Sequence, residues 1–178
     1  MRVTPTVIAD VLLLEPRVFG DARGFFLESY NEQVFADATG LQVQFVQDNH
    51  SRSQRHVLRG MHFQTENPQG KLVRVVSGAV FDVVVDIRRD SPTYGLWMGV
   101  ELSVDNHRQL WIPPGLAHGF LVLSETADFL YKTDAYYHPA SERCLAWNDP
   151  RAAIDWPLGD AQPLVSPKDA MGLSLDSL

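Results

Sequence analysis

Short apolar runs separated by glycine, proline and other turn residues dominate the centre of this 178-residue sequence. The runs are rich in valine, isoleucine, leucine and aromatic residues, and most are too short to form helices. Many are apolar on both faces, as strands are inside a packed double sheet. The pattern predicts an all-β fold, a jelly-roll sandwich or barrel. The runs lie at residues 72–76, 79–87, 96–102, 109–112, 119–123 and 128–133.

A few short helices are also predicted. Asn31 is a good N-cap and Gly40 a good stop for a helix between them, because Asn caps and Gly terminates helices. Two further turns or helices are expected to begin at Asp149-Pro150 and Ser166-Pro167, where Asp or Ser precedes Pro. The apolar face of the first helix would contain Val34, Phe35 and Ala38.

Length, charge and cysteine content exclude several classes of protein. The length and the 45% hydrophobic content suit one domain with a full core, so residues 1–178 are expected to form a single domain. The one cysteine, Cys144, excludes an internal disulfide and a multi-cysteine metal site. A net charge of -7 argues against non-specific nucleic-acid binding. Without a signal-like start or an apolar run of about 18 residues, we expect a cytoplasmic protein that binds neither nucleic acid nor membranes.

The densest group of reactive residues lies between Arg59 and Lys71, with His62 between them. Histidine can take a proton near neutral pH, lysine can stabilise an oxyanion, and arginine can bind phosphate. Glycines in the same stretch would allow a ligand to approach the backbone closely. The alternative interpretation is that His62 is a hydrogen-bonded core residue and Lys71 merely ends a strand.

Two further segments contain single candidates. A Pro-Gly turn leads to His118, which could direct the imidazole into a barrel mouth or could simply bury it in a rigid hairpin. Period-two alternation puts Phe129, Tyr131 and Thr133 on one face. A buried tyrosine hydroxyl needs a partner, so Tyr131 is either a proton donor or an ordinary core residue.

Two remaining patterns each allow more than one interpretation. Phe45, Gln47 and Asn49 share a face, and two amides beside a phenylalanine are more typical of ligand contacts than of packing. Ser166 followed three residues later by Asp169 is typical of a helix capping box. Asp169 could alternatively orient a histidine, as the aspartate of a catalytic triad does.

Together these motifs make the chain resemble the dTDP-4-dehydrorhamnose 3,5-epimerase family. The resemblance runs from about Val7 to Asp169 in order and without a large gap. It implies a cupin-type jelly roll, a homodimer, and an isomerase that uses no metal or other cofactor. The implied substrate is a dTDP-sugar, dTDP-4-dehydro-6-deoxy-D-glucose, converted to dTDP-4-dehydro-L-rhamnose in dTDP-L-rhamnose biosynthesis. The matching segments are residues 59–64, 69–75, 80–88, 109–120, 129–132, 147–150 and 166–169.

The resemblance also implies roles for single residues. His62 would be the general base with Asp169 as its partner, Tyr131 the general acid, and Lys71 the group that stabilises the enolate. Tyr137 would stack on thymine. The segment of residues 23–28 would reach across the dimer into the site of the other subunit. Substrate contacts would come from Arg23, Glu28, Gln47, Asn49, Arg59, His118, Glu142 and Lys168.

The chemistry of such an epimerisation agrees with these residue types. Protons on the carbons next to a ketone are acidic because their removal gives an enolate. Inversion needs one proton-transfer group on each side and a positive group at the ketone oxygen, which His62, Tyr131 and Lys71 can supply. Arg59 and Arg23 suit a diphosphate.

Three other functions compete with this interpretation. A metal-dependent cupin oxygenase or isomerase would need an early His-X-His pair, but Gln64 stands at the second position. His62 and His118 alone make a poor ligand set for a transition metal. A non-catalytic sugar-nucleotide-binding cupin would not need His62, Lys71, Tyr131 and Asp169 together. A relative that inverts only one carbon, or acts on a related dTDP-keto sugar, would keep all four.

Overall fold

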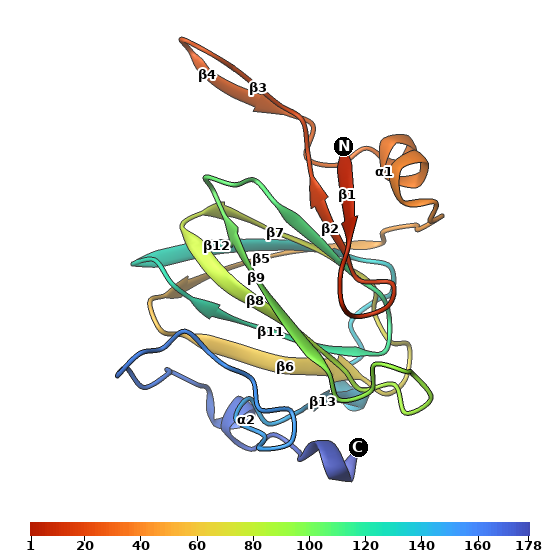
Figure 1. Ribbon diagram of the computed structural model, residues 1–178, viewed down its shortest axis with the longest axis vertical. Coiled ribbons are helices and arrows are strands. Elements are labelled where there is room, and N and C mark those ends of the chain that lie inside the picture. The colour runs from red at the N-terminus through yellow and green to blue at the C-terminus, as the bar shows by residue number, and fades with distance from the viewer.

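The computed structural model describes residues 1–178 and shows two antiparallel sheets that face each other as a barrel (Figure 1). The five-stranded sheet has the order β13 (Glu142–Cys144), β6 (Leu58–Gln64), β11 (Leu116–Val122), β8 (Ala79–Asp86), β9 (Trp97–Ser103). The all-β jelly-roll prediction is confirmed. The six-stranded sheet has the order β1 (Arg2–Pro5), β2 (Leu12–Glu15), β10 (Gln109–Ile112), β7 (Lys71–Ser77), β12 (Thr126–Thr133), β5 (Gln47–Gln54).

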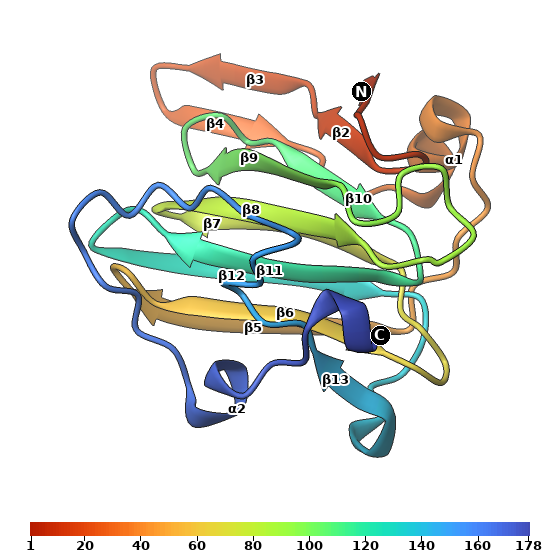
Figure 2. The ribbon, with the colours of Figure 1, turned by 60° about the horizontal axis from the view of Figure 1, so that its bottom comes forward.

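Apolar packing on both faces of the five-stranded sheet explains why its strands have no polar side. One face meets the six-stranded sheet in the main core, which includes Val84, Phe120 and Phe129. The other face carries Val83 and Leu121 and lies under the C-terminal segment, which crosses it in Figure 2. All seven residues of β11 are therefore buried. The continuous apolar runs in the sequence follow from this double burial.

The first helix forms where the sequence predicts it. The helix α1 (Glu32–Thr39) begins after Asn31, whose side chain accepts a hydrogen bond from the Val34 backbone N–H at 3.2 Å. It ends at Gly40, whose φ of 74° is the left-handed conformation that glycine tolerates best. Of its apolar face only Phe35 is fully buried, edge-on against Trp111.

The remaining helices are single turns within the C-terminal 40 residues of the chain. The helix α2 (Pro167–Ala170) begins after Ser166, as predicted. The prediction of a turn at Asp149-Pro150 is confirmed, but no helix follows: the Asp149 carboxylate accepts hydrogen bonds from the N–H groups of Arg151 and Ala152 and closes a turn instead. None of the helices has the length and hydrophobicity that crossing a lipid bilayer requires. Two 3₁₀ turns complete the set, η1 (Pro139–Ser141) and η2 (Leu175–Ser177).

A β-hairpin projects away from the barrel. Its strands β3 (Val18–Asp21) and β4 (Gly24–Leu27) pair only with each other (Figure 1). Phe19, Phe25 and Phe26 are exposed on it, with Phe26 at 68%. Three exposed aromatic rings on one hairpin are typical of a surface that another protein covers.

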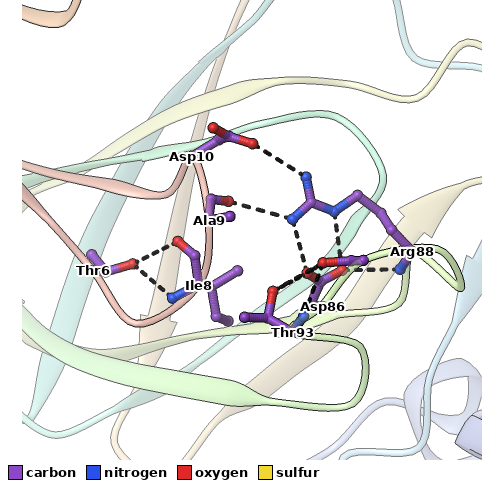
Figure 3. Close-up of polar contacts among 8 residues, drawn as sticks. Thr6, Ile8, Ala9, Asp10, Asp86, Arg88 and Thr93 are labelled. Carbon is purple, nitrogen blue, oxygen red and sulfur yellow. Dashed lines mark hydrogen bonds and ion pairs between the residues drawn. The ribbon is translucent and has the colours of Figure 1, made fainter.

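An ion pair, Asp86–Arg88, joins the end of β8 to the N-terminal loop, which Arg88 contacts at Ala9 and Asp10 (Figure 3). Asp86 is fully buried and accepts hydrogen bonds from the Arg88 guanidinium, at 2.8 and 3.0 Å, and from the hydroxyls of Ser91 and Thr93, both at 2.6 Å. Arg88 also lies 3.6 Å from the Asp10 carboxylate. Burial alone would raise the pKa of Asp86, but these donors outweigh it and lower the pKa.

We expect Asp86→Asn to destabilise the fold by about 3–5 kcal/mol, because it leaves the Arg88 charge without its buried partner. Urea unfolding at pH 7 measures the effect. Asp10→Asn is the matched control: this carboxylate is 72% exposed and contacts the same arginine, so its loss should cost about 0.5 kcal/mol or less. Equal, small effects of the two substitutions would contradict the account.

Candidate active site

A cavity of about 400 Å³ opens between the two sheets. Its wall combines residues from strands that are far apart in sequence, chiefly β5, β6, β7, β11 and β12. Gln69, which the sequence analysis did not select, also lines it. The structure therefore brings most of the predicted site residues together, namely Gln47, Asn49, Arg59, His62, Lys71, His118, Tyr131, Tyr137 and Glu142.

His62 and Asp169 form a hydrogen-bonded pair at one wall. The His62 Nε2 atom lies 2.6 Å from an Asp169 carboxylate oxygen, and that carboxylate is 5% exposed. Burial alone would raise the pKa of Asp169, but the contact with His62 outweighs it and the pKa is lowered. The backbone N–H of Asp169 donates a hydrogen bond to the Ser166 hydroxyl oxygen at 3.1 Å. The helix cap and the histidine partnership therefore coexist in one residue.

Two glycines let the strands that carry His62 and His118 approach closely. A side chain on Gly60 would place its Cβ 2.6 Å from the Gly119 Cα atom, and one on Gly119 would meet the Arg59 carbonyl at 2.5 Å. Gly60 also has a φ of 114°, which other residues rarely adopt. Glycine at both positions therefore fixes where the neighbouring side chains enter the cavity.

Lys71 and Tyr131 come from the sheet opposite His62. Lys71 begins β7 and Tyr131 lies on β12, both in the six-stranded sheet, whereas His62 lies on β6 in the five-stranded sheet. Burial lowers the pKa of Lys71 to about 8. The charges of Asp82 and Glu142 favour the ammonium form and oppose this shift, but burial has the larger effect. Burial raises the pKa of Tyr131, and the Glu142 charge adds to that effect. Both groups face the cavity from the wall across from the histidine.

A second histidine–carboxylate pair lies at the cavity wall, where His118 lines the cavity and Asp82 is buried behind it. The His118 Nε2 atom is 2.9 and 3.1 Å from the two Asp82 oxygens, and both side chains are buried. Burial lowers the pKa of His118, so the ring is held neutral. His118 was expected to contact the substrate, and Asp82 was not among the predicted site residues. The signal was present, because a charged residue inside the apolar strand β8 needs a buried partner.

The cavity mouth is polar and contains five predicted residues. The Tyr137 hydroxyl donates to Glu142 at 2.7 Å, and Lys168 forms an ion pair with the same carboxylate. Burial alone would raise the pKa of Glu142, but these partners outweigh it and lower the pKa. Gln47 donates to Asn49 at 2.9 Å, and the Asn49 Nδ2 atom is buried without a partner. An unpaired buried donor at a cavity is well placed to bind a ligand oxygen.

Four predicted residues do not line this cavity within a single chain. Asp169 and Lys168 touch lining residues, His62 and Glu142, whereas the other two lie apart from it. Arg23 is in the β3–β4 hairpin, paired with Asp21 at 2.5 Å, and Glu28 follows the hairpin and accepts from Asn31. The expectation that Phe45 shares the face of Gln47 is wrong. Phe45 precedes β5 and packs against the aromatic rings of α1 and β10, because the pairing of β5 with β12 begins only at Gln47.

The ligand set of a metal-dependent cupin does not assemble here. Gln64 donates to the Asn67 carbonyl at 2.7 Å and accepts from His138, so its amide serves a loop. His118 is bound to Asp82. Neither side chain is free to join His62 around a cation.

Cys144 lies beside the His62–Asp169 pair. It is opposite His62 in the β13–β6 register, and it is buried. Burial and the Asp169 charge raise the pKa of its thiol to about 12. A thiol held in the protonated form is a poor nucleophile, so Cys144 is no candidate for covalent catalysis.

Comparison with known proteins identifies a family whose model matches nearly the whole chain. A family model described as dTDP-4-dehydrorhamnose 3,5-epimerase matches residues 5–177. The chain belongs to this family. The resemblance found in the sequence motifs is thereby confirmed over nearly the whole length of the epimerase.

Individual members of the family are similar to this chain in sequence and in fold. It is 62% identical over 172 residues to dTDP-4-dehydrorhamnose 3,5-epimerase of Pseudomonas aeruginosa, covering 97% of this chain and 94% of the relative. Its fold matches dTDP-6-deoxy-D-glucose-3,5-epimerase of Legionella pneumophila, solved in complex with dTDP-4-keto-L-rhamnose, with a TM-score of 0.95 and 53% identity over 98% of this chain and 93% of that one. A dTDP-4-dehydrorhamnose 3-epimerase of Streptomyces niveus is 43% identical, over 98% of this chain and 84% of the relative.

Proposed function

We propose that this chain converts dTDP-4-dehydro-6-deoxy-D-glucose to dTDP-4-dehydro-L-rhamnose by inverting carbons 3 and 5. It is an isomerase of the epimerase class, acting in dTDP-L-rhamnose biosynthesis. The observation that carries the proposal is the placement of the His62–Asp169 pair and Tyr131 on opposite sheets, on either side of one cavity. Inversion at a carbon requires such an arrangement, because the proton leaves from one face and returns to the other.

The proposed mechanism assigns one step to each group. His62 removes the proton next to the ketone, and Asp169 orients the ring and stabilises the imidazolium. The Lys71 ammonium stabilises the enolate oxygen, and its burial strengthens that interaction. Tyr131 then donates a proton on the opposite face of the sugar. Repetition at the second carbon completes the reaction, and no step needs a metal or a redox cofactor.

The nucleotide part of the substrate is proposed to occupy the polar mouth. The half-exposed Tyr137 ring is free to stack on thymine, and Asn49 presents an unpaired donor. Arg59 holds Ser53 through its Nε at 2.9 Å, which leaves its terminal nitrogens for the diphosphate. We place the reaction in the cytoplasm, because a charged nucleotide sugar does not cross a membrane unaided.

The active unit is proposed to be a homodimer. Arg23 and Glu28 match substrate-contact positions but lie outside the cavity of their own chain. The β3–β4 hairpin, which contains Arg23 and directly precedes Glu28, carries three exposed phenylalanines that a second copy would cover. A two-fold assembly can therefore complete each site with the hairpin of the other subunit.

Mixing Arg23→Ala and His62→Ala chains should restore part of the activity that each variant lacks. Random re-pairing makes half the molecules heterodimers, and one of the two sites in each heterodimer is intact. About one quarter of the wild-type activity is therefore expected. Each variant alone is the control. No recovery after subunit exchange, or an active monomer in sedimentation at assay concentration, would contradict the shared site.

The epimerisation rate should fall as the pH rises above about 8, because Lys71 then loses the proton that stabilises the enolate. A pH profile of kcat/KM measures this alkaline limb. Asp82→Asn removes a charge that favours the ammonium form, so the limb should move to lower pH. A limb that keeps its position in Asp82→Asn would show that Lys71 does not determine it.

Incubation of the purified protein with dTDP-4-dehydro-6-deoxy-D-glucose tests the function directly. NMR at both carbons is expected to show inversion at carbons 3 and 5. Inversion at carbon 3 alone would place the chain with single-carbon relatives such as the Streptomyces niveus 3-epimerase. An unchanged sugar would leave only a nucleotide-sugar-binding role.

A further inference from the structure

Three side chains beside the cavity have the chemistry of a metal site. One ligand atom from each of His62, Cys144 and Asp169 lies within 4.8 Å of the other two. Nitrogen, sulfur and carboxylate oxygen are the donors that zinc sites in proteins use. The group differs from the metal site of other cupins, because His118 and Gln64 take no part in it.

The positions of the three residues in the fold make the group compact. His62 and Cys144 are directly opposite in the β6–β13 pair, and Asp169 already touches the imidazole. Ligand atoms of a tetrahedral zinc ion lie about 3–4 Å from one another, given metal–ligand bonds of about 2.0–2.3 Å. A cation therefore needs the sulfur to move closer by less than about 2 Å and the 2.6 Å hydrogen bond to open slightly.

Access and a fourth coordination position come from the cavity. His62 lines its wall, and its side chain is 29% exposed, whereas Cys144 and Asp169 are buried behind it. The Cys144 thiol makes only one weak contact, to the Leu145 carbonyl at 3.4 Å. A cation arriving through the cavity would meet His62 first and reach the two buried ligands past its ring. Three protein ligands then leave a fourth position for a water molecule, as in catalytic zinc sites.

We propose that His62, Cys144 and Asp169 form a binding site for a thiophilic divalent cation of the Zn²⁺ type, and that its occupation inhibits the enzyme. The cation replaces the thiol proton: the S–H bond breaks, a metal–sulfur bond forms, and the proton leaves to solvent. The bound ring of His62 must stay neutral to ligate the cation. It then cannot take up a proton from the sugar, and Asp169 no longer orients it.

The inhibition rests on the proposed role of His62 as the base, but the binding does not. The experiment therefore needs one readout that is independent of catalysis. Cys144 is the only cysteine in the chain, so a thiolate-to-Co²⁺ charge-transfer band can arise from this site alone. We expect that band when Co²⁺ is added to the chelator-treated dimer, and its loss when Zn²⁺ displaces Co²⁺.

The matched variant is Cys144→Ser, which removes the soft ligand at nearly constant volume. We expect the untreated and chelator-treated wild type to be equally active. Zn²⁺ should inhibit the wild type at micromolar concentrations, reversibly by chelator, and Mg²⁺ should not, since it prefers oxygen ligands. Cys144→Ser should keep its basal activity, lose the cobalt band, and need about 100-fold more Zn²⁺ for the same inhibition.

Two results would overturn the proposal. One is the absence of a thiolate–cobalt band in the wild type. The other is equal Zn²⁺ inhibition of the wild type and Cys144→Ser, which would place the inhibitory cation elsewhere. An inactive wild type that still shows the band would instead reject the proposed function and leave the metal site standing.

Discussion

His62→Ala is expected to lower the epimerisation rate by about 10⁴-fold, the upper range for a general acid–base group. The loss should be the same for exchange of the sugar's protons with deuterated water, because no enolate forms without the base. The reason is structural: His62 is held by the buried Asp169 carboxylate, is 29% exposed, and lines the cavity from the five-stranded sheet, across from Tyr131. His50 also lines the cavity and is held by Asp128, but it lies on β5, in the same sheet as Tyr131.

The partner residue supplies the control for this prediction. Asp169→Asn keeps the shape of the side chain and a hydrogen bond to His62, but it removes the charge that stabilises the imidazolium. We expect a smaller loss than for His62→Ala, in exchange and inversion alike. A His62→Ala enzyme that still exchanged its substrate protons at the wild-type rate would refute the assignment of the base.

Tyr131→Phe should separate exchange from inversion. The enolate still forms, but the proton returns from the His62 side or from stray solvent, so deuterium incorporation outruns inversion. Loss of a general acid predicts an inversion rate lower by about 10²–10⁴-fold. Measuring both rates on one sample by NMR provides the comparison.

The rival interpretation makes Tyr131 a core residue whose hydroxyl anchors the sheet. Its removal would then cost about 1–3 kcal/mol through the partner left unpaired. In the structure the Tyr131 side chain lines the cavity and packs only against the edge of the main core. We therefore expect a melting curve close to that of the wild type. A marked loss of stability, with exchange and inversion falling together, would favour the anchoring role.

The central strands could be predicted because strands that are buried on both faces have continuous apolar sequences. The helix α1 could be predicted because Asn31 and Gly40 mark its two ends. The strand β5 could not, since its sequence, QDNHSRSQ, has no apolar face. One side lines a polar cavity through Gln47 and Asn49, and the other carries Asp48, which pairs with Lys132 at 2.9 Å. A strand that is polar on both faces gives no hydrophobic alternation to detect.

The candidate site was predictable where its residues cluster in sequence. Asp82 and Cys144 were not predicted as site residues, because their place in the site depends on pairing between distant strands. Asp82 reaches His118 from β8, and Cys144 lies opposite His62 across β13 and β6. Asp169 shows a second limit. The sequence pattern suggested either a helix cap or a histidine partner. In the structure Asp169 is both: its backbone N–H bonds the capping Ser166, and its carboxylate bonds His62.

In the proposed reaction, protons leave and return at both carbons next to the ketone, from opposite sides of one cavity. Turnover of dTDP-4-dehydro-6-deoxy-D-glucose by the wild type in deuterated water, read by NMR, tests it most directly. We expect the L-rhamno product with solvent deuterium at carbon 3 and at carbon 5. Product that retains its original hydrogen at both carbons would contradict it.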